Sequence, residues 1–222
     1  MNPTEQLGSK HWRQLDIADP ERLKVPVTVV GAGGIGSEVV KILAKVGFST
    51  IEVYDFDSVE DHNLPNQFYR NKDVGKPKVD ALKEIISDFS DVSIDAYNEE
   101  FIKQKSNEML IVTVDSMTAR IAIYNAVKYQ PQVKFLMDAR MGGEFFCVYT
   151  VDMSNPLEKE AYEKSLYPSS EAVELPCTAK SIMYCVGMVS AVVVHNAKRI
   201  CMGQAFSKQI DMDLPNMMFY KL

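Results

Sequence analysis

The sequence predicts an α/β protein built on a doubly wound, mostly parallel β-sheet. Apolar runs of strand length alternate with segments of helical periodicity between residues 25 and 138. The run from Met109 to Val114 is almost wholly apolar, as is expected of a strand in a sheet that helices cover on both faces. This alternation is typical of parallel sheets whose strands are joined by helices.

The first strand, the first helix and the second strand follow in that order. Val25 to Val30 is a short β-branched run, and four glycines separate it from the helix. Ile51 to Tyr54 predicts the second strand, which ends in Asp55. The helix between them has Gly47 as a candidate C-cap and an apolar stripe formed by Val39, Val40, Leu43 and Val46.

A long polar segment from Asp57 to Lys78 interrupts the alternation. It is too polar for a core and too long for a tight connection between a strand and a helix, so we expect a functional loop. The elements predicted after it are a helix over 79–89, a strand over 92–97, the 109–114 strand, a helix over 118–129 and a strand over 134–138.

The C-terminal third departs from the parallel pattern. Glu144 to Val151 predicts a strand at an antiparallel edge of the sheet. Residues 152–176 are polar, carry three prolines, and are interpreted as a lid or a crossover loop. A long, mostly buried helix over 178–202 and a C-terminal hairpin over 205–222, turning near Leu214, follow. We expect residues 1–222 to form one domain with an N-terminal arm over 1–24.

Composition favours a globular cytoplasmic protein and disfavours several other classes. The 24 basic and 30 acidic residues give a net charge of −6, which disfavours a nucleic-acid partner. Met1 to Lys10 lacks the apolar core of a signal peptide. The longest uncharged apolar run, Ile182 to Val194, would span about 20 Å as a helix, against roughly 30 Å for a bilayer core. The four cysteines form no Cys-x-x-Cys pair, so neither a structural zinc site nor a disulfide is expected.

The glycines form a phosphate-binding pattern. Gly31, Gly33, Gly34 and Gly36 lie directly between the first strand and the first helix. Glycines permit a tight turn and a close approach of the backbone to phosphate oxygens, and the helix N-terminus adds free N–H groups. Asp55, 19 residues after Gly36, stands where a carboxylate can accept hydrogen bonds from a ribose. The pattern predicts a Rossmann-like nucleotide site and does not distinguish NAD from ATP.

Three further motifs follow the second strand: Asp55-Phe56-Asp57-Ser58-Val59, Asn63-Leu64-Pro65-Asn66-Gln67 and Gly75-Lys76-Pro77-Lys78. Together they resemble the adenylation core of the ThiF/MoeB/HesA family, to which the ubiquitin-activating enzymes are related. The pattern of that family is Asp-x-Asp-x-Val, then Asn-Leu-x-Arg-Gln, then Gly-x-Pro-Lys. The resemblance covers roughly residues 11 to 200, and the combined motifs are far more specific than the glycines alone.

The resemblance implies that the chain binds ATP with Mg²⁺. Asp55 would hold the ribose, and Asn63, Gln67 and Lys78 would lie around the phosphates. Asp57 either belongs to the same site or caps a turn.

Two more positions match the family outside the polar segment. Asp115, at the end of the 109–114 strand, matches the magnesium aspartate, although it could instead cap the helix that begins near Thr118. Arg13 matches an N-terminal arginine that reaches the phosphates of the neighbouring subunit, which implies a homodimer.

The sequence departs from the family at one sensitive place. Asn66 stands where the family pattern has arginine, so a charge-assisted contact worth roughly 1.5–3 kcal/mol is missing. Arg70, four residues later, could replace it. Otherwise we expect slower catalysis or a non-catalytic homologue.

Cys177 is a candidate nucleophile. It resembles a family cysteine that precedes the last long helix, and a helix N-terminus together with Lys180 would lower the pKa of its thiol. It could equally be a small buried hydrophobe. The other three cysteines, Cys147, Cys185 and Cys201, are interpreted as structural.

Two other polar residues leave alternatives open. Arg140, after the 134–138 strand, could meet a substrate carboxylate or pair with a structural aspartate. His195 lies within an apolar helix and is interpreted as a core histidine.

The family resemblance implies an adenylyltransferase that activates the C-terminal glycine of a small ubiquitin-like or sulfur-carrier protein ending in Gly-Gly. Adenylation of a peptide or of a modified tRNA base is a second hypothesis, and the acidic charge makes the tRNA version less attractive. A nicotinamide-dependent oxidoreductase rests only on the glycine loop and Asp55. A catalytically silent nucleotide-binding protein is favoured only by Asn66.

Overall fold

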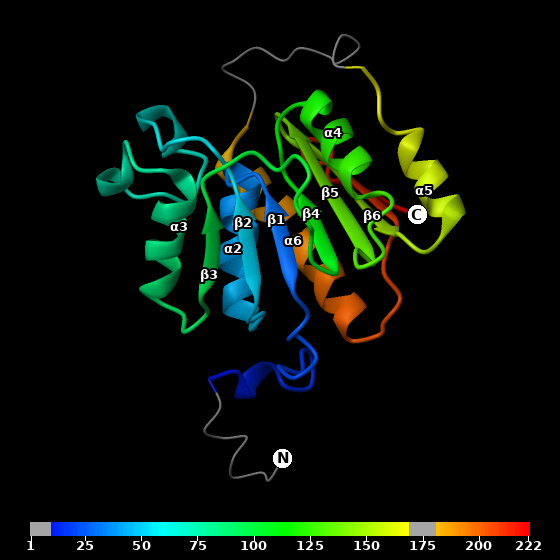
Figure 1. The fold of residues 1–222 in the computed structure, drawn as a ribbon, viewed down its shortest axis with the longest axis horizontal. Helices are drawn as coiled ribbons and strands as arrows, with labels where there is room; N and C mark the ends of the chain where they lie inside the picture. The colour runs from blue at the N-terminus through cyan, green and yellow to red at the C-terminus, as the bar shows by residue number, and fades with distance from the viewer. Residues whose placement is uncertain (1–9, 169–180) are drawn as a thin grey trace.

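The computed structural model describes residues 10–168 and 181–222. It contains an eight-stranded sheet in the order β3-β2-β1-β4-β5-β6-β7-β8 (Figure 1). The five parallel strands are β1 (Val27–Val30), β2 (Ile51–Tyr54), β3 (Ile94–Tyr97), β4 (Met109–Val112) and β5 (Phe135–Gly142). The antiparallel strands are β6 (Phe145–Asp152), β7 (Gln209–Asp213) and β8 (Met218–Lys221).

Helices cover both faces of this sheet. Those of the described residues are α2 (Gly34–Val46), α3 (Lys78–Ser87), α4 (Met117–Val127), α5 (Pro156–Glu163) and α6 (Met183–Cys201), with three short 3-10 turns η1 (Trp12–Gln14), η2 (Asp61–Asn63) and η3 (Asn71–Asp73). Apolar residues of α2, α3 and α6 share one buried cluster, and those of α4 and α5 share a second. The prediction of a doubly wound α/β sheet is therefore confirmed.

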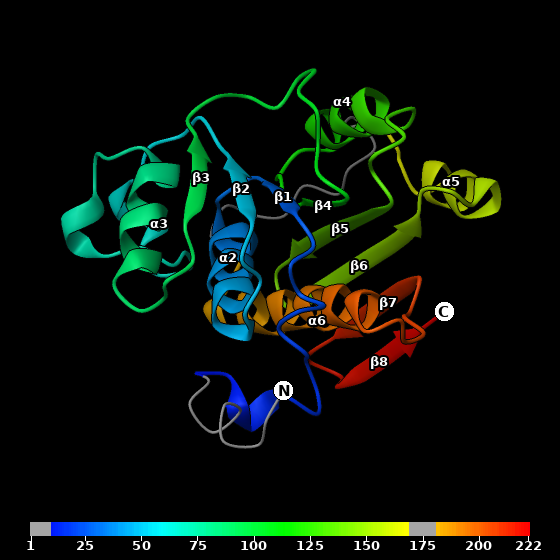
Figure 2. The same ribbon diagram turned by 60° about the horizontal axis from the view of Figure 1, so that its bottom comes forward.

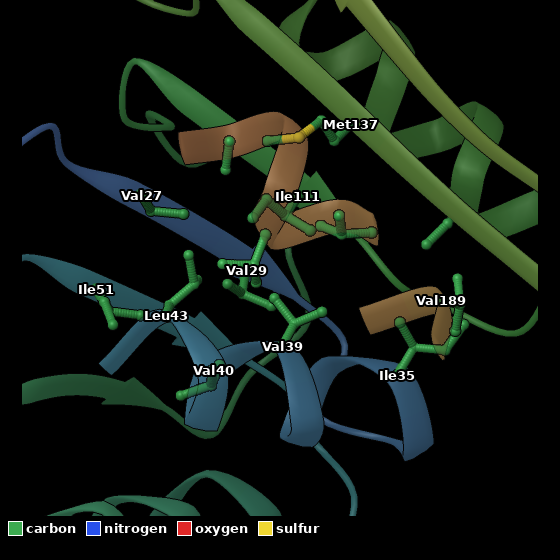
Figure 3. Close-up of a cluster of buried hydrophobic side chains, with 14 of the residues drawn as sticks. Val27, Val29, Ile35, Val39, Val40, Leu43, Ile51, Ile111, Met137 and Val189 are labelled. Atoms are coloured by element: carbon green, nitrogen blue, oxygen red, sulfur yellow. The ribbon is translucent and has the colours of Figure 1, made fainter. Parts of the chain in front are cut away.

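Alternation along the strands assigns their side chains to the two clusters. Val29 and Ile111 belong to the α2/α6 cluster, where Figure 3 shows them facing Val39 and Leu43 of α2. Leu110 and Val112 of β4 belong to the α4/α5 cluster instead. Because both faces are covered, β4 is buried along its whole length. Each such apolar side chain contributes about 1.5–3 kcal/mol when fully buried.

The C-terminal hairpin is confirmed, and it corrects the predicted place of the preceding strand. Strands β7 and β8 pair around a turn in which Met217 has a φ of 50°. Strand β6 is antiparallel as expected, but it lies between β5 and β7. The antiparallel edge of the sheet is β8, because β7 pairs with the other side of β6 and β8 pairs with β7.

Two details of the C-terminal third differ from the sequence pattern. Part of the 152–176 range, interpreted as a lid or a crossover loop, forms helix α5, with Asn155 as its N-cap and a buried Tyr162. The last long helix begins at Met183, five residues later than predicted. Residues 169–180 lie outside the described part of the chain. No helix within 10–168 and 181–222 combines the length and apolar character that a membrane crossing needs.

Candidate functional site

The sheet has a topological switch point between β1 and β4. The chain leaves β1 toward β2 on one side, whereas β4 continues toward β5 on the other. Ligands of open α/β sheets bind at the carboxyl ends of strands at such a point. Gly31 follows β1 there, and Thr113 follows β4.

The four glycines of the predicted phosphate loop differ in how well each position would accommodate a side chain. Gly31 has a φ of +95°, and a Cβ on it would lie 3.0 Å from the backbone of Thr113. A Cβ on Gly36 would overlap the carbonyl oxygen of Gly31, and one on Gly34 would come within 2.9 Å of the Asn66 carbonyl oxygen. A Cβ on Gly33 would meet no atom of the described residues within 4 Å. The described residues therefore leave the space beside Gly33 open at the N-terminus of α2, where N–H groups attract anions.

Asp55 ties the phosphate loop to the end of β2. One carboxylate oxygen accepts a hydrogen bond from the Ala32 N–H at 2.6 Å, and the other accepts one from the Asp57 N–H at 2.8 Å. Burial raises the pKa of Asp55, and these two N–H groups and the Lys78 charge oppose the rise. Each oxygen keeps a further lone pair, with which a ribose hydroxyl could bond.

Lys78 and Asp57 form an ion pair beside the loop. The Lys78 side chain is 8% exposed, and its Nζ lies 2.7 Å from Oδ2 of the half-exposed Asp57. A buried ammonium group needs an anionic partner. Asp57 supplies that partner in this structure, and nucleotide phosphates would be a second source of negative charge for the same ammonium.

The loop that follows β2 contains buried polar atoms with unused hydrogen-bonding capacity. Asn63 Oδ1 accepts a hydrogen bond from the Glu60 N–H at 3.0 Å, so that oxygen serves the local fold. Within the described residues, Gln67 Oε1 and Asn66 Oδ1 are buried and accept no hydrogen bond. The side-chain N–H group of Asn66 donates a hydrogen bond to Oγ of Ser181, which lies just before α6. Buried polar atoms without partners are rare, and they are expected where a ligand or water binds.

Arg70 does not take the place of the missing family arginine. Its guanidinium bonds Asp73 at 2.7 Å, Asp88 at 2.6 Å and Glu84 at 3.4 Å. Three carboxylates hold the side chain against η3 and α3, so the expectation that Arg70 replaces the charge lost at Asn66 is wrong.

Asp115 lies exposed at the carboxyl end of β4, two residues beyond Thr113. The Oγ of Ser116 accepts a hydrogen bond from the Ala119 N–H at 3.1 Å, which makes Ser116 the N-cap of α4. The alternative in which Asp115 caps this helix is therefore wrong.

Arg13 is not brought together with the other predicted residues. It lies exposed in η1, where Gln14 donates to the carbonyl oxygen of Val46 at the C-terminal end of α2. The phosphate loop is at the opposite end of this 13-residue helix, a distance of about 20 Å at 1.5 Å per residue. Figure 2 shows residues 10–24 beyond that far end of α2. Arg13 therefore cannot reach the phosphate loop of its own subunit in this conformation.

The cysteines separate into one candidate and three structural residues. Cys177 lies outside the described residues. Burial raises the pKa of the Cys147 thiol to about 12 and those of Cys185 and Cys201 to about 11. Thiols that stay protonated at neutral pH are poor nucleophiles, which agrees with their structural interpretation. His195 is exposed on α6, so its interpretation as a core histidine is wrong.

Arg140 takes the structural alternative. Its Nε lies 2.7 Å from Oδ2 of the fully buried Asp138, and Nη1 donates to the Ser165 carbonyl oxygen at 2.9 Å. Through these bonds the guanidinium connects β5 to the residues that follow α5.

Sequence reasoning missed two residues that brace the phosphate loop. The Tyr69 hydroxyl donates to the Ala32 carbonyl oxygen at 2.6 Å, and burial raises the pKa of Tyr69, which keeps that donor protonated. Thr113 Oγ1 donates to the Gly31 carbonyl oxygen at 2.8 Å. The polar Thr113 within an otherwise apolar run was a usable signal, whereas nothing in the sequence marks Tyr69.

The chain is similar to known proteins in sequence and in fold. The model of the ThiF family matches residues 13–221. The NEDD8-activating enzyme E1 catalytic subunit of Arabidopsis thaliana is 45% identical over 80 residues, which are 35% of this chain and 18% of that relative. The crystal structure of PaaA superposes with a TM-score of 0.75 at 18% identity, covering 100% of this chain and 74% of PaaA. Escherichia coli MccB, solved with AMPCPP and MccA, gives a TM-score of 0.68 at 16% identity, covering 91% and 65%.

Proposed function

This chain belongs to the ThiF family, and we propose that it is an ATP-dependent adenylyltransferase acting on the C-terminal carboxylate of a small ubiquitin-like or sulfur-carrier protein that ends in Gly-Gly. The observation that carries the proposal is the open space beside Gly33 at the N-terminus of α2. Asp55 borders the loop that forms this space, and Lys78 reaches the neighbouring Asp57.

The chemistry needs little beyond orientation and positive charge. A carboxylate oxygen of the partner attacks the α-phosphorus of ATP, the bond to the bridging oxygen breaks, and pyrophosphate leaves with the electron pair. The N–H groups of α2 and the Lys78 ammonium stabilise the negative charge that builds on the leaving group. No general base is required, because the nucleophile is already ionised.

The oxygen groups at the carboxyl ends of the parallel strands fit a magnesium ion. Mg²⁺ prefers oxygen ligands and is commonly held by one or two carboxylates together with substrate phosphates. Asp115 offers an exposed carboxylate at the carboxyl end of β4, and we assign it as the protein ligand. The bound ion would supply charge neutralisation for the departing pyrophosphate.

A second candidate substrate is a peptide. The crystal structure of E. coli MccB was solved with AMPCPP and MccA, and its superposition covers 91% of this chain. A peptide that ends in a carboxylate supplies the same nucleophile as the C-terminus of a small protein. The two candidates differ in the partner alone, since the adenylation step is the same.

Nucleotide choice tests the proposal against an oxidoreductase. We expect the chain to bind ATP with magnesium in preference to NAD, because a hydride-transfer site does not require Lys78, Gln67 and Asp115. Calorimetric titration of the purified chain with each nucleotide measures the two affinities. Tight NAD binding without ATP binding contradicts adenylation.

The place of Arg13 leads to a proposal about assembly. Because Arg13 lies at the far end of α2 from its own loop, we propose that it serves the loop of a second copy in a two-fold dimer. Mixing Arg13→Ala chains with Asp115→Ala chains should then restore about a quarter of the sites, since half of the dimers are mixed and each has one intact site. Exchange of labelled pyrophosphate into ATP measures the recovery. Each variant incubated alone is the control, and no gain on mixing would remove Arg13 from the neighbour's site.

A further inference from the structure

A buried arginine holds the backbone on both sides of Asp115. Arg120 lies in the first half of α4 and is 5% exposed. Its Nη2 donates to the Val114 carbonyl oxygen at 2.6 Å, and its Nη1 donates to the Ser116 carbonyl oxygen at 3.4 Å. The residues that flank Asp115 are therefore both bonded to one guanidinium.

The same guanidinium is anchored in the neighbouring strand. Its Nε donates to Asp138 Oδ1 at 2.6 Å, and Asp138 is fully buried in β5. The other oxygen of Asp138 accepts from Arg140 at 2.7 Å and from the Tyr162 hydroxyl at 3.1 Å. Removing one member of a buried ion network leaves an unpaired charge, so its members hold one another in place.

We infer that Arg120 is a positioning residue that fixes the Asp115 carboxylate for metal binding. The inference rests on the proposed function, in which Asp115 holds the magnesium ion. The planar fork of arginine donates here to the Asp138 carboxylate and to three backbone carbonyls, including that of Ala139 at 3.3 Å, whereas a lysine has a single nitrogen and cannot span them. Groups that orient metal ligands in this way typically change metal affinity 10–100-fold when they are replaced.

Arg140 provides a matched control for Arg120. Both arginines bond Asp138, but the backbone partner of Arg140 is Ser165, far from Asp115 in the chain. Arg120→Lys and Arg140→Lys therefore disturb the same buried aspartate by the same substitution. Only Arg120→Lys releases the loop that carries Asp115.

The test measures how strongly magnesium enhances ATP binding, without any turnover. ATP is titrated calorimetrically into the wild-type chain and each variant, once with Mg²⁺ and once with EDTA, and the ratio of the two affinities is compared. We expect Arg120→Lys and Asp115→Ala to lower this ratio at least about tenfold, and Arg140→Lys to keep it. Circular dichroism establishes that each variant is folded.

The outcomes separate the inference from the proposed function. A ratio unchanged in Asp115→Ala overturns the metal assignment itself. A lowered ratio in Asp115→Ala together with an unchanged ratio in Arg120→Lys overturns only the role of Arg120, and so does an equal loss in Arg140→Lys. If Arg120→Lys does not fold, Asp138→Asn takes its place, because it weakens the anchor while leaving Arg120 present. A ratio unchanged in Asp138→Asn would then overturn the inference.

Discussion

Gly36→Ala should destabilise the protein strongly, whereas Gly33→Ala should leave its fold unchanged. A Cβ at Gly36 would overlap the carbonyl oxygen of Gly31, and backbone atoms cannot move aside as the end of a flexible side chain can. Overpacking in well-packed regions costs about 1–3 kcal/mol, and we expect Gly36→Ala to reach at least the upper end. For a domain of this size that corresponds to a fall in Tm of about 6–12 °C, measured by circular dichroism.

Gly33→Ala is the matched control within the same loop. Its φ of −74° needs no left-handed backbone, and an added Cβ would meet no atom of residues 10–168 and 181–222 within 4 Å. We expect a change in Tm of about 2 °C or less, as for surface substitutions. The methyl group would still occupy the space that we propose for phosphate, so calorimetry should show weaker ATP binding. Unchanged ATP affinity in a folded Gly33→Ala chain would move the nucleotide away from this loop.

The fold could be predicted where periodicity and burial act together. The apolar run of β4 predicted a strand covered on both faces, and the stripe from Val39 to Val46 predicted α2. Helix α5 was missed because its mean composition is polar, and only Tyr162 is buried among its residues. The apolar neighbours of His195 in sequence led to the wrong interpretation, because helix α6 is exposed at that position.

The candidate site could be predicted in outline because the carboxyl ends of parallel strands lie at the same end of the sheet. Asp55 follows β2 and Asp115 follows β4, so the strand pattern alone brings both residues to that end. Side-chain contacts between residues far apart in the sequence could not be predicted in this way. The anchor of Arg120 is Asp138 on the next strand, and the three acidic partners of Arg70 come from η3, α3 and its C-cap.

Asp115→Ala should abolish most of the partner-dependent exchange of pyrophosphate into ATP. If Asp115 holds the magnesium ion, its loss forfeits several kcal/mol of charge stabilisation in the transition state. At roughly 1.4 kcal/mol per decade, the exchange rate falls about a hundredfold or more. Asp115 is exposed and is not the cap of α4, so the variant should fold with a Tm close to that of the wild type. An exchange rate within about threefold of wild type would contradict the assignment.

Cys177→Ala separates adenylation from thiol transfer in the same assay. Adenylation needs the phosphate loop, Lys78 and Asp115 but no thiol, so we expect Cys177→Ala to keep the exchange that Asp115→Ala loses. If Cys177 accepts the activated partner, the wild-type chain should form a thiol-sensitive adduct on a denaturing gel that Cys177→Ala cannot form. An adduct that persists in Cys177→Ala would place the nucleophile at another residue. The raised thiol pKa values at Cys147, Cys185 and Cys201 argue against those three, because a protonated thiol does not attack an acyl adenylate efficiently at neutral pH.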